Sequence, residues 1–418
     1  MEYLRIIKYF SMRLFNRLSL LVAAIILIAC GEDRTYEYYK LTEENQWIFS
    51  QMQSNYIWGD TMKQPARNKF FATASSFFGS LLKKGDKTSF FCDSAFRTSY
   101  GITFSIVRDP LAIKASKSYA PVLFVEPGSS ADKAGLKRGM WISRIGKSDV
   151  TANNHGYLER GEATTVCTSQ IVPDTIDGSF IWSDGDTIPL TTATIVEPTT
   201  LQLDTIYNIP DHKVGYMLCN RLADAEEINQ ALARFSGEGI TDLIVDLRYC
   251  SNGSLQTAAE FASAIAPEAS GSVFCSLKHN ELNSSKDKEI LFSTPSTALN
   301  VWRVYIITTS ATRGTAEAFT AALRLTLGCD RVILIGTTSA GENLCTQSIE
   351  SPFDFAINPA VAYIYTADDA PLSAYGQTVD YEISELSIPV IHKLGDVNES
   401  LLYCTLHLIL NGTLPPTE

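Results

Sequence analysis

The chain has 418 residues, enough for about three domains of roughly 150 residues, each with its own core. Hydrophobic residues make up 45% and charged residues 19%, which is typical of globular proteins and excludes a disordered or fibrous chain. The net charge of −12 argues against nucleic acid as a partner. Outside the first thirty residues no apolar run reaches about 18 residues, which excludes a polytopic membrane protein.

The amino terminus has the features of an export signal. An apolar segment at 18–28, too short to span a bilayer comfortably, follows four basic residues: Arg5, Lys8, Arg13 and Arg17. The segment ends in Leu-Ile-Ala-Cys at 27–30, which resembles the lipobox of bacterial lipoproteins, whose cysteine is acylated. We therefore expect a signal peptide at 1–30 and an exported chain that a lipid on Cys30 anchors to the bacterial cell envelope, at the outer membrane or the periplasmic face. The alternatives are a signal anchor ending in a chance cysteine and a start at Met12 instead of Met1.

The other cysteines would then lie in an oxidising compartment, where disulfides are permitted. Most of them occupy apolar segments, so we expect buried free thiols for most of Cys92, Cys167, Cys219, Cys250, Cys275, Cys329, Cys345 and Cys404. The five histidines are scattered, and neither Cys-x-x-Cys nor His-Glu-x-x-His occurs. The sequence therefore predicts no metal site, and nothing in it indicates another cofactor.

Residues 41–91 have the apolar spacing of helices. We expect two helices separated at Pro65, the second with one apolar face from Phe70 to Leu82 and an end at 83–86. From 100 to 198 the pattern changes to short strands and turns. It includes a strand at 122–125, a turn at 127–128, a helical turn at 130–134 closed by Gly135, and a hairpin with a linker at 174–200.

From Lys213 onward, strand patterns alternate with helix patterns. The strands are expected at 214–218, 243–247, 304–309 and 331–335, and the helices at 224–235, 255–266 and 315–327. This succession predicts a mostly parallel sheet, and its continuous apolar strands indicate a sheet that is covered on both faces.

Four motifs occur in a characteristic order along the chain. They are Gln-Trp-Ile-Phe at 46–49 with Asn-Tyr-Ile-Trp at 55–58, Val-Glu-Pro-Gly-Ser-Ser-Ala at 125–131 with Ala-Gly-Leu-Lys-Arg-Gly at 134–139, Asp-Leu-Arg-Tyr at 246–249, and Thr308-Thr309 leading through Thr312 to Glu317. Together they resemble the C-terminal-processing (tail-specific) serine peptidases, specifically the lipoprotein branch with an embedded PDZ-like domain. The resemblance covers nearly all of the mature chain.

The resemblance implies a multidomain α/β protein. After the signal peptide it would comprise an N-terminal helical region at 31–95, a PDZ-like β-rich domain with a linker at 96–200, and a tail-specific-protease-like α/β core at 201–418. In this family, the turn before the last motif's glutamate carries a nucleophilic serine. A lysine in a Gly-Lys pair after the next strand is the general base.

Both catalytic positions differ in this chain. Counting back three residues from Glu317 places Gly314 at the nucleophile position, and Glu342 follows Gly341 where the family has its lysine. A serine–lysine dyad needs a hydroxyl and a neutral amine to accept its proton, and neither is present here. No lysine occurs between Lys288 and Lys393, so this stretch offers no shifted base.

Displaced catalytic groups are an alternative, with Ser310, Thr312 or Thr315 as nucleophile and Glu342 as base. The simpler interpretation makes Thr312 the N-cap of the helix at 315–327 and makes the other two turn residues. The family's glycine-rich turn is reduced to Cys-Ser-Asn-Gly at 250–253, so Gly253 and Thr315 are the positions left for an oxyanion hole. Glu342 is expected to pair with Arg313 or Arg248.

A PDZ-like domain binds a peptide C-terminus as an added strand, while loop amides hold its carboxylate. The matching loop would lie at Tyr100, Gly101, Ile102 and Thr103, although an ordinary strand start also explains this segment. The favoured interpretation is a non-catalytic homologue that binds unfolded polypeptide or peptide C-termini. The alternatives are an active serine-type peptidase with displaced residues and a scaffold component with a large exposed apolar patch.

Overall fold

The computed structural model describes residues 35–93, 98–113, 116–159, 161–176, 178–196 and 199–416. The predicted signal peptide and its lipidation site, Cys30, lie outside the described residues. The chain forms two compact units. One contains the residues up to Ser50 together with Lys63–Leu81, and the other contains Gln51–Met62 together with the chain from Leu82 onward.

The first unit is helical. Its elements are α2 (Thr35–Asn55), whose last residues belong to the second unit, the 3-10 helix η2 (Arg67–Phe71) and α3 (Ala74–Leu81). The two predicted helices are confirmed, but the second begins later than expected. Phe70 lies in η2, where its carbonyl accepts a hydrogen bond of 2.8 Å from Asn45 Nδ2. The ring centroids of Phe70 and Phe77 are 4.9 Å apart. The two residues therefore pack together although no continuous helix joins them.

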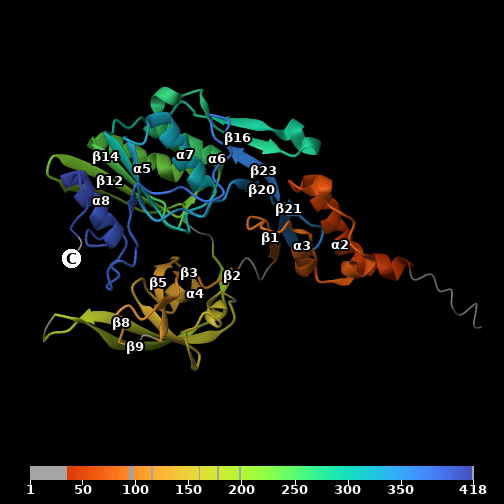
Figure 1. Ribbon diagram of the computed structural model, residues 1–418, viewed down its shortest axis with the longest axis horizontal. Helices are drawn as coiled ribbons and strands as arrows, with labels where there is room; N and C mark the ends of the chain where they lie inside the picture. The colour runs from red at the N-terminus through yellow and green to blue at the C-terminus, as the bar shows by residue number, and fades with distance from the viewer. Residues whose placement is uncertain are drawn as a thin grey trace, which may run out of the picture. The chain divides into compact units, whose positions relative to one another are not determined.

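A seven-stranded antiparallel sheet follows in the chain (Figure 1). Its strands are β3 (Ile102–Phe104), β4 (Val107–Arg108), β5 (Ser118–Val125), β6 (Trp141–Ile145), β7 (Ser148–Asp149), β8 (Thr164–Pro173) and β9 (Phe180–Leu190). The predicted strand at 122–125 is confirmed and extends back to Ser118. The predicted helical turn is α4 (Ser130–Lys133), and the hydroxyl of its N-cap, Ser129, accepts a hydrogen bond from Asp132 N. The 3-10 helix η3 (His155–Leu158) precedes β8.

The main sheet has the order β11-β12-β14-β18-β19-β24. Its strands are β11 (Leu201–Ile209), β12 (His212–Cys219), β14 (Asp242–Asp246), β18 (Arg303–Thr308), β19 (Val332–Gly336) and β24 (Tyr381–Glu382). All neighbouring pairs from β12 onward are parallel, as the alternation of strands and helices predicts. Because parallel strands end at the same edge, the segments that follow β14, β18 and β19 meet there.

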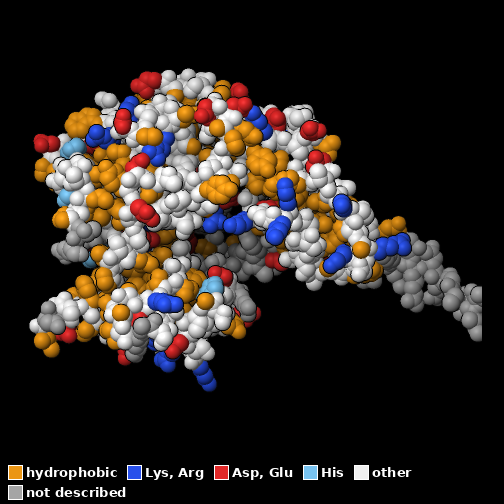
Figure 2. Space-filling model, in the orientation of Figure 1, with side chains coloured by type: hydrophobic (Ala, Val, Ile, Leu, Met, Phe, Trp, Pro, Cys, Tyr) orange, Lys and Arg blue, Asp and Glu red, His pale blue; other side chains and the backbone are white. Residues whose placement is uncertain are grey.

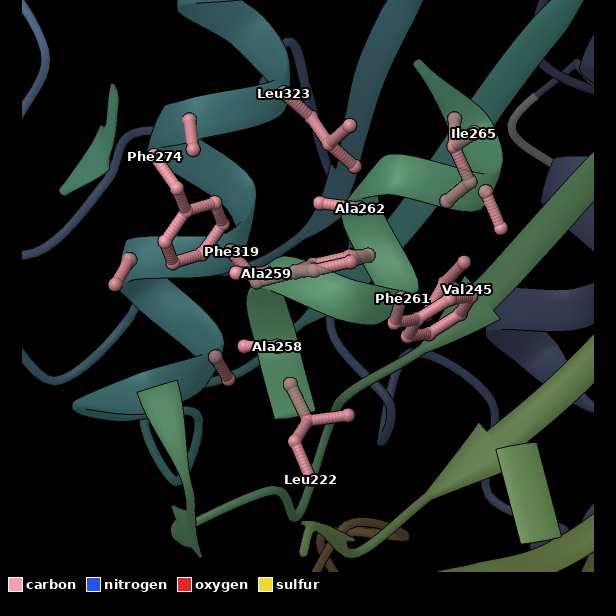
Figure 3. Packing of buried hydrophobic residues seen from close by; sticks show 14 of the residues in the cluster. Leu222, Val245, Ala258, Ala259, Phe261, Ala262, Ile265, Phe274, Phe319 and Leu323 are labelled. Carbon is pink, nitrogen blue, oxygen red and sulfur yellow. The ribbon is translucent and has the colours of Figure 1, made fainter. Parts of the chain in front are cut away.

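Alternating side chains of these strands fill two separate cores. Val245 and Ile306 pack in the core formed with α5 (Ala225–Glu238), α6 (Leu255–Ile265) and α7 (Thr315–Leu327). Figure 3 shows part of this core, in which Phe261 of α6 lies beside Val245 and Phe319 points from α7 toward α6. Ile244 and Ile307 point to the opposite face, which α8 (Ser400–Asn411) covers. The sheet is therefore buried on both faces, as predicted.

The remaining strands form smaller sheets. One has the order β17-β16-β23-β20 and contains β16 (Val273–His279), β17 (Lys288–Leu291), β20 (Leu344–Thr346) and β23 (Ala360–Tyr365). A second joins β1 (Phe90–Asp93), β22 (Phe355–Asn358) and β21 (Ile349–Glu350), so the helical pattern expected up to residue 91 is wrong at its end. Two-stranded pairs join β2 (Thr98–Ser99) to β10 (Thr194–Ile195) and β13 (Arg221–Leu222) to β15 (Asn252–Gly253). The remaining 3-10 helices are η1 (Gly59–Thr61), η4 (Pro267–Ala269) and η5 (Glu281–Lys286).

Free thiols are found at Cys167, Cys219, Cys250, Cys275, Cys329, Cys345 and Cys404. Cys219, Cys250 and Cys275 are buried, Cys329 is exposed and the rest are half-buried, so burial is less general than expected. Within the part of the chain that the structure describes, no helix is long and apolar enough to span a membrane. Acidic and basic side chains are interspersed over the visible face (Figure 2).

A buried network of charged side chains lies at the carboxyl end of β14. Arg248, which is fully buried, bonds Asp246 at 2.7 Å, Glu399 at 2.6 Å and Glu385 at 3.1 Å. Arg138, from the segment between α4 and β6, reaches the same two glutamates at 2.7 and 3.2 Å. These ion pairs hold the segment that follows β14 in position.

Candidate functional site

The turn from β18 to α7 is tied to the end of β14 by two threonines. Thr312 is fully buried, and its hydroxyl donates a hydrogen bond of 2.7 Å to the carbonyl of Leu247 and accepts one from Thr309 N. The hydroxyl of Thr309 donates to the carbonyl of Arg248. The expectation that Thr312 is the N-cap of α7 is therefore wrong, because Gly314 occupies that position.

Gly314 has the backbone of a sharp strand-to-helix turn. Its φ of 58° and ψ of −110° place it in a region that strongly favours glycine and that is also used where a turn exposes a nucleophile. A Cβ at this position would meet the Glu342 carboxyl group at 3.8 Å, an ordinary van der Waals distance. The structure thus brings together the two positions that the sequence aligned with the nucleophile and its base.

Glu317 connects the two halves of this site. Its buried carboxylate accepts hydrogen bonds from Gly314 N at 3.0 Å, Gly341 N at 2.7 Å and Glu342 N at 2.8 Å, and from the hydroxyl of Ser339. These four donors come from both turns, so one side chain sets their relative position. In the sequence Glu317 serves only to locate the nucleophile position, because three of its four hydrogen-bond partners are 22 to 25 residues away.

Glu342 is a half-buried carboxylic acid whose ordinary pKa is 4.5. Burial raises the pKa of Glu342 to about 7; Arg313 opposes this rise, and the carboxylates of Glu317 and Asp86 add to it. The expected partner Arg248 is bound to three other carboxylates. Arg313 lies near enough to act electrostatically, but among the described residues no ion pair within bonding distance joins it to Glu342.

The raised pKa of Glu342 predicts a stability that depends on pH. Between about pH 4.5 and 7 the folded state binds more protons at this group than the unfolded state, so stability falls as pH rises through this range. We expect Glu342→Gln to raise the free energy of unfolding over the parent by about 1–3 kcal/mol at pH 8, and by little at pH 4.5. Urea unfolding at both pH values, beside the exposed control Glu289→Gln, measures this. An equal gain at both pH values would contradict it.

Gly253 and Thr315 lie together at the positions proposed for an oxyanion hole. The hydroxyl of Thr315 donates a hydrogen bond of 3.3 Å to the carbonyl of Gly253. Gly253 belongs to β15, where a Cβ would come within 2.6 Å of the carbonyl oxygen of Leu222, so only glycine fits. Thr315 is the first residue of α7, and its amide has no acceptor within the helix.

These groups line a cleft of about 310 Å³. Its walls come from the starts of α6 and α7, from β17 and from β20, and include Ser254, Leu255, Gln256, Leu277, Lys288, Ile290, Gly314, Thr315, Glu342, Leu344, Cys345 and Ile364. Among the displaced nucleophile candidates, Thr315 alone lines this cleft; Ser310 is exposed elsewhere and Thr312 is buried. No sequence motif indicated that Lys288 and Cys345 belong to this cleft. Their strands, β17 and β20, are brought to it by sheet pairing.

A second cavity lies along β3, the edge strand of the seven-stranded sheet. It has a volume of about 360 Å³ and is lined by Ile102, Thr103, Phe104, Ser105, Ile106, His155 and Glu159. Two of the four predicted peptide-binding residues, Ile102 and Thr103, therefore face a groove. Tyr100 is instead buried in the core of this sheet, and Gly101 packs so close to Ser129 that a Cβ would come within 2.3 Å of it.

The described residues contain no group of three or more His, Cys, Asp or Glu side chains that could hold a metal ion. The cleft itself presents the carboxyl group of Glu342, the amine of Lys288, the thiol of Cys345, backbone amides, and the hydroxyls of Ser251, Ser254, Thr315 and Thr346.

Two regions of the chain match a known family. Residues 213–383 match Peptidase family S41, and residues 43–104 match the Peptidase S41 N-terminal domain. The chain therefore belongs to peptidase family S41. This confirms the family that the four sequence motifs indicate.

Solved structures of other proteins align with most of this chain, and those with TM-scores above 0.5 show the fold. An S41 protein from Bacteroides fragilis NCTC 9343 aligns with a TM-score of 0.72 and 24% identity over 88% of this chain and 97% of that chain. Mature CPAF aligns with a TM-score of 0.53 and 11% identity over 90% and 99%. The photosystem II D1 C-terminal processing protease gives 0.48 and 14% over 82% and 93%. No curated protein matches the chain.

Proposed function

We propose that this chain is a non-hydrolysing member of family S41 that binds unfolded polypeptide or peptide C-termini. The observation that carries the proposal is the pair Gly314 and Glu342. They face each other across 3.8 Å, measured from a Cβ at 314, at the positions where the family has its serine and lysine. The turns that would present a dyad are thus retained, while neither the hydroxyl nor the amine is present.

The expected rate and the orientation of the Thr315 hydroxyl both support a loss of hydrolysis. Removing a nucleophile together with its base typically costs about 10⁴–10⁶ in rate. The carboxylate of Glu342, with a pKa of about 7, could accept a proton, but the hydroxyl of Thr315, the displaced nucleophile candidate that lines the cleft, donates its hydrogen bond to the carbonyl of Gly253. An active enzyme that uses Thr315 remains the second candidate, because this hydroxyl does line the cleft.

The groove along β3 supports a second contact with the same ligand. Edge strands accept an extended peptide through backbone hydrogen bonds, and Ile102, Phe104 and Ile106 offer apolar contacts for its side chains. We propose that residues 96–200 form the PDZ-like domain and its linker, between a helical region at 31–95 and the core at 201–418. We also propose export and lipid anchoring through Cys30, which rest on the sequence of the first thirty residues.

The test uses the chain without residues 1–30 and unfolded casein. We expect casein to bind, as measured by co-sedimentation or fluorescence anisotropy, and to remain uncut after prolonged incubation. Cleavage that Thr315→Val abolishes would overturn the proposal and make Thr315 the nucleophile. Absence of both binding and cleavage would remove the polypeptide-binding role.

A further inference from the structure

Glycine at position 314 leaves room at the centre of the cleft. The direction in which a side chain would leave Gly314 leads to the Glu342 carboxyl group, with nothing else within 4 Å of that Cβ. The walls combine polar groups with the aliphatic side chains of Leu255, Leu277, Ile290, Leu344 and Ile364, which offer an apolar surface within a mainly polar cleft. A cleft of about 310 Å³ is large enough for one long side chain of a bound polypeptide.

The Glu342 carboxylate has no bonded partner among the described residues. Its backbone amide is held by Glu317, but neither carboxylate oxygen takes part in a hydrogen bond or an ion pair there. Glu317 cannot relieve this, because its own oxygens already accept four hydrogen bonds. A half-buried carboxylate without a partner is costly, and a cation or a strong donor from a ligand would stabilise it.

The charges around Glu342 favour a cation over a neutral donor. Glu317 on α7 and Asp86 on the segment before β1 are negative, and the positive group that acts on Glu342 is Arg313, whose side chain is exposed. Lys288 of β17 lines the same cleft, and Cys345 of β20 is near it. A positively charged group of a ligand would be repelled by Lys288 and attracted by Glu342, so it would bind at the Glu342 end of the cleft.

From this arrangement we infer that the cleft takes a lysine or arginine side chain of the bound polypeptide, with Glu342 as its counter-ion. The inference rests on the proposed function, since it concerns the polypeptide that the chain binds. Lysine and arginine suit the site because their aliphatic stems pack on apolar walls while the charged head reaches a carboxylate. The family has a lysine amine at this position, which would bind no cation. The carboxylate of Glu342 selects one instead.

Matched peptides test this inference. One fluorescent ten-residue peptide of Gly, Ser and Leu carries a single arginine, and the other carries citrulline, which has the same shape and no charge. With the chain lacking residues 1–30 at pH 8, we expect the arginine peptide to bind about tenfold more tightly. Between pH 8 and pH 6 its affinity is expected to fall about tenfold as Glu342 is protonated, while that of the citrulline peptide stays constant.

Two variants decide the role of Glu342. Glu342→Gln is expected to remove the preference for arginine and its pH dependence, while Glu289→Gln, an equal charge change on an exposed residue of β17, leaves both intact. Equal binding of the two peptides to the parent would overturn the inference while leaving polypeptide binding intact. Loss of the preference in both variants would also overturn it, because bulk charge would then explain the effect. Failure of casein and of both peptides to bind would instead overturn the proposed function.

Discussion

The double variant Gly314→Ser with Glu342→Lys, made in the chain without residues 1–30, is expected to cleave casein. The backbone at Gly314 already has the φ and ψ of a nucleophile turn, and a Cβ there points to residue 342. Glu317 holds both turns by hydrogen bonds that the substitutions leave in place. Burial at position 342 would lower the pKa of a lysine, which favours the neutral amine that a dyad needs.

The expected gain is at least about 10²-fold over the parent, because a transplanted dyad recovers only part of the 10⁴–10⁶ that its loss typically costs. Gly314→Ala with Glu342→Lys is the matched control, since it introduces the same strain and charge without a hydroxyl. Cleavage is followed by the release of fluorescent casein fragments. A folded double variant that binds casein yet stays inactive would show that Gly253 and Thr315 do not form a working oxyanion hole.

Removing Arg248 is expected to destabilise the core by about 3–5 kcal/mol. Its guanidinium is fully buried and bonds three carboxylates, those of Asp246, Glu385 and Glu399. In Arg248→Met the carboxylates of Glu385 and Glu399 would share only Arg138, and Asp246 would lose its ion pair, so buried negative charge would be left without compensation. The free energy of unfolding in urea, followed by circular dichroism, measures the effect.

Arg234→Met provides the comparison for this second prediction. Arg234 pairs with Asp204 at 2.6 Å, but its side chain is 49% exposed, so its loss is expected to cost less than about 1 kcal/mol. Similar losses in the two variants would contradict the view that burial of the network matters. The Arg248 network also supports the site, because Thr309 and Thr312 bond the carbonyls of Arg248 and Leu247.

Much of the fold could be predicted from local sequence patterns. Continuous apolar strands alternating with amphipathic helices predicted the parallel sheet, and the turn at 127–128 followed by a helical turn closed by Gly135 predicted α4. The assignment of Gly314 and Glu342 to the positions of the family's serine and lysine also rests on the sequence, because each position is defined by its spacing from a neighbouring marker. The second helix was placed too early because Phe70 packs correctly from a 3-10 turn as well.

The sequence by itself determined the family, the order of strands and helices, and the identity of residues 314 and 342. The tertiary structure decided that Gly314 and Glu342 face each other, that Glu317 joins their turns, and that Lys288 lines the same cleft. It also decided that Thr312 bonds Leu247 rather than capping α7. The physical reason is the same in each case. Local patterns fix the period of each segment, whereas contacts between side chains depend on strand pairing and on turn conformations set by residues far apart in the chain.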